Sequence, residues 1–165
     1  MTHPDRRPRI AVLTKIRLPE IVPLFFELIR SIRVTTQDPY FRSLRVSRPR
    51  ARKWLARYIG KRDKKVWVST VEGRVVGYIA GEIIDCFLPI SRVGRIGYIS
   101  GACVEGPFRR KGIMESLERK MIGFFRKRGV DYAELHILSK NRPARRCWTK
   151  LGYRTFREQM RKRIQ

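Results

Sequence analysis

A short basic loop carries the residues of this sequence best suited to holding a phosphate. The loop contains Arg109, Arg110, Lys111 and Gly112, and it follows an apolar stretch that ends at Val104. The first N–H groups of a helix lack partners inside the helix and lie at the positive end of its dipole. A glycine there lets an anion approach the backbone, and added cations favour a phosphate or pyrophosphate. An ordinary turn before a solvated basic helix accounts for the loop equally well.

The elements on either side of the loop are a predicted strand and a predicted amphipathic helix. Residues 96–104 are apolar with interspersed glycines, which is typical of a buried strand. After the loop, apolar residues recur at the spacing of one helical face, at Leu117, Met121, Ile122, Phe124 and Phe125. The basic loop is therefore expected at the carboxyl end of a strand and the amino end of a helix.

A second motif follows the first along the chain. A strand is predicted from Tyr132 to Leu138, and the next helix reads N-R-P-A-R-R-C-W-T-K-L-G-Y from Asn141 to Tyr153. Together with the R-x-x-G spacing of Arg109 and Gly112, this pattern resembles the GNAT superfamily of N-acetyltransferases. The resemblance covers residues 66–160. It implies transfer of an acetyl group from acetyl-CoA to a primary amine by direct attack.

The resemblance also implies a set of cofactor-binding residues. Backbone N–H groups near Val104 would hold the pantetheine arm, and those of the basic loop would hold the pyrophosphate, with added charge from its cations. Asn141 suits a contact with the cofactor arm and an ordinary helix N-cap equally well. Met114 departs from the family, which usually has Gly or Ala there. The implied residues are Cys103, Val104, Arg109, Arg110, Lys111, Gly112, Ile113, Met114, Asn141, Arg145 and Trp148.

Three residues are candidates for the catalytic proton transfers. An ammonium is not nucleophilic, so a base, or a water chain leading to one, must deprotonate the acceptor. His136 is the preferred base because its ordinary pKa of about 6.5 suits neutral pH, although a half-buried strand histidine with a backbone partner is an alternative. Glu82 is the second candidate. Trp148 stands where many family members have a tyrosine that protonates the leaving thiolate, but an indole only donates a hydrogen bond, and packing is its alternative role.

The order of predicted elements is β-α-α-β-β-β-α-β-α-β, which is typical of a mixed α/β fold. The first strand is expected from Ile10 to Ile16, a hairpin at 66–71 and 75–84, and a last strand from Tyr153 to about Arg163. A helical crossover makes the strands ending at Val104 and starting at Tyr132 parallel. The resemblance implies one domain over residues 1–165, with about six to seven strands, about four helices and splayed parallel strands around the cofactor. Residues 1–9 are expected to form a loose basic tail.

The formal net charge of the sequence is +25. Such a charge attracts polyanions through counterion release, which suits an acceptor near RNA or the ribosome, an acidic acceptor, or a basic surface without a dedicated partner. The competing function is a GNAT-like module that has lost catalysis and binds nucleic acid. No RNA-binding signature is present to support it, and the more complete acetyltransferase motifs favour an enzyme.

Other features bear on location and ligands. No apolar run is long enough for a membrane helix, and the N-terminus has no secretory h-region. The cysteines Cys86, Cys103 and Cys147 lack metal-binding spacing and favour a reducing cytoplasm. We therefore expect a cytoplasmic protein without a metal or membrane. The amine acceptor, which loops 33–50 and 85–94 would contact, and the homodimer common in the family are left open.

Overall fold

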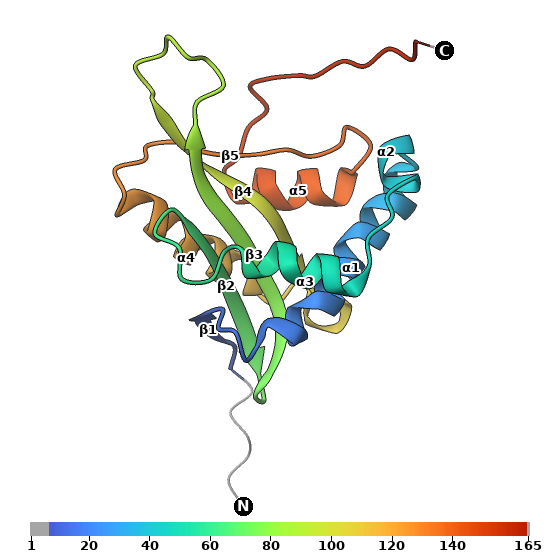
Figure 1. The fold of residues 1–165 in the computed structure, drawn as a ribbon, viewed down its shortest axis with the longest axis vertical. Coiled ribbons are helices and arrows are strands. Elements are labelled where there is room, and N and C mark those ends of the chain that lie inside the picture. Colours follow the sequence, from blue (N-terminus) through green and yellow to red (C-terminus); the bar gives the residue numbers. More distant parts are fainter. Residues whose placement is uncertain (1–6, 165) are drawn as a thin grey trace, which may run out of the picture.

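The fold is a mixed sheet with helices on both faces, as seen in a computed structural model that describes residues 7–164 (Figure 1). The strands lie in the order β1 to β5. Their bounds are β1 (Arg9–Val12), β2 (Lys64–Val71), β3 (Arg74–Asp85), β4 (Arg95–Val104) and β5 (Ala133–Leu135). The helices are α1 (Leu18–Thr36), α2 (Pro39–Arg42), α3 (Arg48–Ala56), α4 (Ile113–Arg126) and α5 (Arg142–Lys150).

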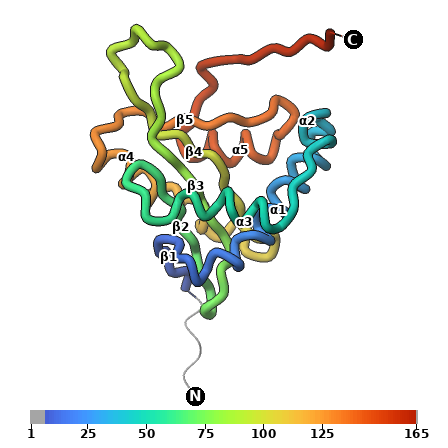
Figure 2. The backbone as a smooth tube through the Cα atoms, viewed as in Figure 1, coloured from blue at the N-terminus to red at the C-terminus, as the bar shows by residue number. Residues whose placement is uncertain are grey.

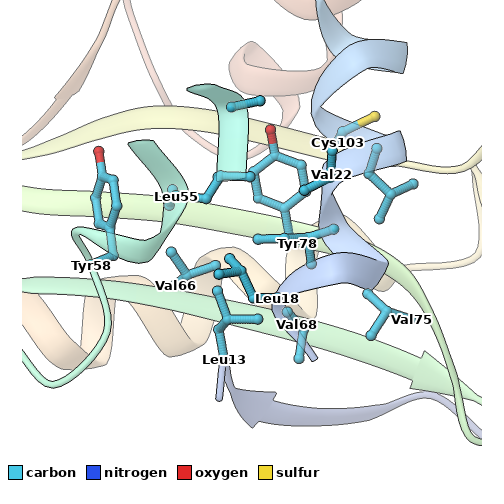
Figure 3. Packing of buried hydrophobic residues seen from close by; sticks show 14 residues of the cluster. Leu13, Leu18, Val22, Leu55, Tyr58, Val66, Val68, Val75, Tyr78 and Cys103 are labelled. Atoms are coloured by element: carbon cyan, nitrogen blue, oxygen red, sulfur yellow. The ribbon is translucent and has the colours of Figure 1, made fainter. Parts of the chain in front are cut away.

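Strand β3 is buried on both faces and separates two apolar clusters. Tyr78 and Ala80 face α1 and α3, where they pack with residues such as Leu55 (Figure 3). Ile79 and Ile83 face α4 on the other side of the sheet. This alternation follows from the period of two along a strand. The two clusters fix the sheet between helix layers and hold the ends of β3 and β4 in place.

Two strand glycines allow α4 to approach the sheet closely. A Cβ atom built on Gly97 would lie 2.4 Å from the Phe125 ring, and one on Gly81 would lie 2.7 Å from the sulfur of Met121. A side chain at either position would displace these buried residues. Close packing of a helix on the sheet therefore accounts for both glycines.

The pairing of the strands confirms the main topological predictions. β2 and β3 form the predicted antiparallel hairpin, with its turn at Glu72 and Gly73, both at positive φ. β4 and β5 are parallel, as the helical crossover requires. Their pairing ends at Ile99 and Leu135, before the carboxyl end of β4. The two strands are therefore unpaired along the second half of β4.

Several boundaries differ from the sequence predictions. The last strand, expected from Tyr153 to about Arg163, is wrong, because residues 154–164 have no regular secondary structure. That segment lacks the alternation of a strand and is rich in like charges, which oppose pairing. The described sheet consequently has five strands, not six to seven. The first strand ends at Val12, and β5 is only Ala133–Leu135. The short α2 and the start of α3 lie within residues 33–50, which the sequence analysis treated as a loop.

The expected loose tail at residues 1–9 needs one correction. Arg9 is already part of β1 and pairs with Thr70 of β2. Residues 1–6 lie outside the described residues. A tail can therefore extend no further than the residues before β1.

The C-terminal segment runs back over the molecule from α5 towards α2 (Figure 2). Arg157 lies over the ring of Phe87 at 4.3 Å, and Arg161 binds the carboxylate of Asp38 at 2.7 Å. Phe87 belongs to the loop between β3 and β4, and Asp38 is the N-cap of α2. The segment thus connects the two loops that the sequence analysis assigned to the acceptor.

Candidate active site

The basic loop ends in a cluster of free backbone N–H groups at the start of α4. A single 3₁₀ turn, Gly106–Phe108, leads into the loop, and both Arg110 and Gly112 have a positive φ, of 63° and 74°. The N–H groups of residues 110–115 donate to no acceptor within residues 7–164, whereas that of Ser116 donates to the Gly112 carbonyl. Successive N–H groups of this kind form a concave anion site, which the helix dipole reinforces.

Arg109 has a different role from its two basic neighbours. Its Nε donates to the Val104 carbonyl at 2.8 Å, and a terminal nitrogen binds the Glu27 carboxylate of α1 at 2.7 Å. Arg110 and Lys111 are exposed and form no ion pair with any described carboxylate. We therefore assign the positioning of the loop to Arg109 and leave Arg110 and Lys111 available to an anion.

Cys103 and Val104 end β4 beside the loop, and both side chains are buried. Burial raises the pKa of the Cys103 thiol to about 11, so the thiol stays protonated and unreactive at neutral pH. A shallow depression of about 170 Å³ between α1 and the loop is lined by Glu27 and Arg109, among others. It is smaller than pockets that enclose a ligand of cofactor size. A cofactor arm is therefore expected along the open strands and the loop.

The opening between β4 and β5 begins at an irregularity of β4. Ala80 of β3 pairs with Gly101 and Gly81 pairs with Ile99, so the register skips Ser100. Ser100 is also the first residue of β4 beyond its last pair with β5. A bulge of this kind re-aims a side chain and interrupts the ladder. Ser100 therefore lies at the point where the parallel strands part.

His136 follows β5 directly and is exposed, with both ring nitrogens engaged. Nδ1 lies 3.2 Å from the hydroxyl of Tyr98, and Nε2 lies 3.0 Å from a terminal nitrogen of Arg157. A guanidinium can only donate, so we assign Nε2 as the acceptor and Nδ1 as the protonated nitrogen. The histidine is neither half-buried nor bound to a backbone group. It can act as a base only if Arg157 moves away.

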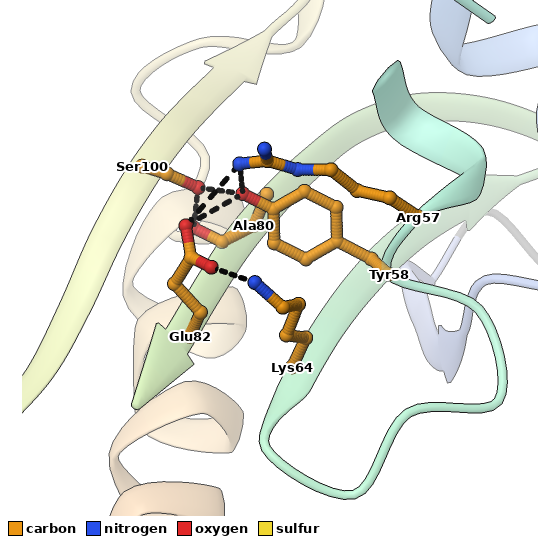
Figure 4. A network of polar contacts seen from close by, with 6 residues as sticks. All are labelled: Arg57, Tyr58, Lys64, Ala80, Glu82 and Ser100. Atoms are coloured by element: carbon orange, nitrogen blue, oxygen red, sulfur yellow. Dashed lines mark hydrogen bonds and ion pairs between the residues drawn. The ribbon is translucent and has the colours of Figure 1, made fainter. Parts of the chain in front are cut away.

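Glu82 is buried in a polar cluster on the face of the sheet that carries α3 (Figure 4). One carboxylate oxygen accepts from the Tyr58 hydroxyl at 3.3 Å and from Arg57 at 3.3 Å. The other oxygen binds the ammonium of Lys64. The Tyr58 hydroxyl in turn lies 2.7 Å from the Ser100 hydroxyl. Two cations therefore compensate the buried carboxylate, which a chain of hydroxyls connects to the strand opening.

The family of the chain follows from comparison with known proteins. The model of the Acetyltransferase (GNAT) family matches residues 29–153. The chain belongs to the GNAT family. An uncharacterized N-acetyltransferase of Methanocaldococcus jannaschii is 28% identical over 144 residues, which are 86% of this chain and 58% of that relative. The chain thus spans little more than half the length of that protein.

Solved structures show the same GNAT fold at low sequence identity. A mutant of the BH1408 protein from Bacillus halodurans has a TM-score of 0.81 and 20% identity, covering 95% of this chain and 99% of that one. An aminoglycoside 6'-N-acetyltransferase from Acinetobacter haemolyticus has a TM-score of 0.76 and 12% identity, with coverage of 95% and 99%. A related enzyme, solved with a bisubstrate analogue of CoA and acetylneamine, has a TM-score of 0.75 and 12% identity, with coverage of 96% and 99%.

The departure of this GNAT chain at Met114 leaves the anion site open. The Met114 side chain is partly buried and packs against the apolar cluster under α4. Ile113 beside it is buried in the same cluster. Neither side chain therefore removes the free N–H groups of the loop. The cofactor role predicted for Met114 stays a prediction, and backbone recognition would need no particular side chain there.

The residues of α5 contribute mainly to local structure. The Asn141 side chain caps the helix by accepting from the Ala144 N–H at 3.3 Å, and Arg145 binds the hydroxyl of Thr155 at 3.0 Å. The ring of Trp148 meets that of Tyr153 edge-on at 5.2 Å. Tyr153 then donates to Glu118 of α4 at 3.2 Å. The N-cap alternative for Asn141 is confirmed, and its amide N–H₂ donates to no described acceptor.

Sequence reasoning missed four residues near the opening, namely Tyr58, Tyr98, Ser100 and Arg157. Tyr98 of β4 pairs with Glu82 of β3. The bounds of predicted strands do not determine which residues pair across them. Tyr58 and Arg157 come from distant parts of the chain. No group of His, Cys, Asp and Glu within residues 7–164 has metal-binding geometry. None of the helices described is long and apolar enough to cross a membrane.

Proposed function

We propose that this GNAT protein transfers the acetyl group of acetyl-CoA to a primary amine. The observation that carries the proposal is the run of N–H groups from residue 110 to residue 115, which have no acceptor among residues 7–164. The run includes the exposed cations Arg110 and Lys111. Such a site suits the pyrophosphate of CoA. A GNAT neighbour of the same fold was solved with CoA, which supports this use of the fold. The acyl donor is a substrate here, and the proposal includes no metal.

The acetyl group would lie where β4 and β5 part, beyond Ile99 and Leu135. There the neutral amine attacks the thioester carbonyl carbon directly. A backbone N–H of the bulged strand near Ser100 would donate to the developing oxyanion, a contribution that depends on preorganised donors. The carbon–sulfur bond then breaks, and CoA leaves as a thiolate or thiol. Holding both reactants in one opening supplies much of the rate enhancement.

The acceptor is a protein N-terminus, a lysine side chain or a small amine, approaching from the face that carries α2, α3 and the C-terminal segment. That face has several exposed cations, including Arg57 and Arg157. They favour an acceptor with acidic groups beside its amine. A location in the cytoplasm is part of the proposal and is supported by the free state of Cys86, Cys103 and Cys147.

Calorimetric titration with acetyl-CoA tests the proposal. Gly112→Ala would strain the loop backbone, because φ at Gly112 is +74°. The substitution adds no steric clash, since nothing lies within 4 Å of the added Cβ. Gly129→Ala is the matched control, since Gly129 has a φ of +68°, equal space and a position beyond the other end of α4. We expect wild-type protein and the Gly129 variant to bind, and the Gly112 variant to bind at least about tenfold more weakly. Absence of binding by folded wild-type protein would refute the function.

A further inference from the structure

We propose that Ser100, Tyr58 and Glu82 form a proton relay from the acceptor amine to a buried carboxylate. The inference rests on the proposed acetyl transfer and assigns the removal of the proton within that reaction. Its basis is a continuous chain of contacts from the strand opening into the protein (Figure 4). The Ser100 and Tyr58 oxygens lie 2.7 Å apart, and the Tyr58 hydroxyl donates to Glu82 over 3.3 Å.

The two ends of the chain differ in access to solvent. Ser100 is partly exposed, sits at the bulge and is the first residue of β4 beyond the last pair with β5. Tyr58 is 2% exposed and Glu82 is 8% exposed. A proton that leaves a substrate in the opening can therefore enter at Ser100 and move away from the reacting atoms.

The hydrogen-bonding capacity of each group fixes the direction. Arg57 donates to both the Tyr58 oxygen and Glu82, at 3.2 Å and 3.3 Å, and can accept nothing. Tyr58 has a single proton, which it donates to Glu82. The Ser100 hydroxyl can then donate its proton to the Tyr58 oxygen. In the absence of substrate it can donate instead to the Ala80 carbonyl, at 3.3 Å. When Ser100 donates to Tyr58, its lone pair is available to a substrate N–H.

The charges around Glu82 suit a transient proton acceptor. Lys64 and Arg57 lie against the carboxylate, and Tyr98 lies across from it on β4. When the relay delivers its proton to Glu82, the two cations remain beside the carboxyl group. Glu82 retains 8% exposure, so its proton can leave to solvent from the carboxyl group itself. The relay is thereby reset for the next turnover.

The bonds and protons balance in this sequence. The acceptor ammonium gives one proton to Ser100, whose own proton passes to Tyr58, and the Tyr58 proton passes to Glu82. The freed nitrogen lone pair bonds to the thioester carbonyl carbon. The carbon–sulfur bond breaks, and the second nitrogen proton leaves with the sulfur as the thiol. The products are the amide, CoA thiol and one proton on Glu82.

Two conservative variants interrupt the relay, and the chain offers a matched control for each. Tyr58→Phe and Ser100→Ala remove one hydroxyl each. Tyr78→Phe and Ser69→Ala also remove one buried hydroxyl each, and the Tyr78 and Ser69 hydroxyls have no hydrogen-bond partner among the described residues. The assay is thiol release from acetyl-CoA, with water alone and with a lysine-containing tripeptide as nucleophile. Acetyl-CoA binding is measured separately by calorimetry.

We expect kcat of both relay variants to fall by about a hundredfold, at the lower end of the range of general acid–base catalysis. KM for acetyl-CoA should stay unchanged, and both control variants should keep the wild-type kcat. The double variant should be no slower than the slower single variant, because either change interrupts the same path. At pH values where the wild-type rate no longer changes with pH, the rates of the two relay variants should still rise. Equal rates in relay and control variants, or a wild-type protein that binds acetyl-CoA but releases no thiol above buffer, would overturn the relay while leaving cofactor binding intact. Absence of acetyl-CoA binding by the folded wild-type protein would refute the proposed function.

Discussion

Arg109 joins Glu27 of α1 to the carbonyl of Val104 at the end of β4, through contacts of 2.7 Å and 2.8 Å. One guanidinium thus fixes the start of the basic loop to a strand and to a helix from the other end of the chain. The planar donor fork of arginine makes both contacts at once, which a lysine cannot do. The arginine of the R-x-x-G motif therefore acts here on the shape of the loop.

Glu27→Gln should weaken acetyl-CoA binding although Glu27 is expected to make no contact with the cofactor. The ion pair is partly exposed, with side-chain exposures of 49% and 22%, so the loss should be modest, about threefold to tenfold in Kd. Calorimetry on Glu27→Gln and Arg119→Ala provides the comparison, because Arg119 forms its one ion pair within residues 7–164 with Glu115, on the exposed face of α4. Equal affinity of wild type and Glu27→Gln would show that the loop holds its shape without the pair.

Gly97→Ala should destabilise the protein, because the new Cβ would lie 2.4 Å from the buried Phe125 ring. Overpacking of this kind costs about 1–3 kcal/mol. Gly123 lies in α4, the helix that carries Phe125, and the Cβ of Gly123→Ala would meet nothing within 4 Å. This variant should instead stabilise the protein by about 0.5–1 kcal/mol. Urea denaturation of the variants measures both changes. Similar midpoints for Gly97→Ala and wild type would mean that α4 shifts without cost.

Local patterns in the sequence were sufficient for the elements around the loop and insufficient for the site between them. The spacing of Leu117, Met121 and Phe125 predicted the buried face of α4, and the crossover rule predicted parallel β4 and β5. The family motif predicted an anion site in the basic loop, and that assignment stays a prediction. Contacts across long sequence separations, such as Tyr58 with Ser100, depend on strand register and helix placement. No short-range pattern encodes these quantities.

For the C-terminal segment, the sequence analysis predicted a strand that the structure does not contain. Its position after α5 suggested a strand, but the residues themselves do not alternate in polarity. Arg157 instead contacts Phe87 and His136, and Arg161 contacts Asp38 and Tyr40. The segment is placed by side-chain contacts, which are not readable from hydrophobic periodicity.

Trp148→Tyr tests whether the protein lacks an acid for the leaving thiolate. A phenol can give up a proton and an indole cannot, so the variant should raise kcat severalfold at unchanged KM for acetyl-CoA. Thermal denaturation of the same variant is the control, because Trp148 also packs against Tyr153. A slower or unchanged rate in a variant of wild-type stability would show that no acid is missing at this position.

The Asp38–Arg161 pair makes attachment of the C-terminal segment dependent on pH. Hydrogen bonds from Arg161 lower the pKa of the Asp38 carboxyl below its ordinary value. Because the pKa of Asp38 is lowered in the folded state, the Asp38–Arg161 pair stabilises the attached segment fully above the unfolded-state pKa of Asp38. This stabilisation is lost as the pH falls through the folded-state pKa. Asp38→Asn should reproduce the loss at neutral pH. Trypsin should then cleave after Arg161 faster in the variant than in wild type, with cleavage after the exposed Arg119 on α4 as the internal reference. Equal ratios of the two cleavage rates would show that the remaining contacts, such as Arg157 with Phe87 and Arg161 with Tyr40, hold the segment without the ion pair.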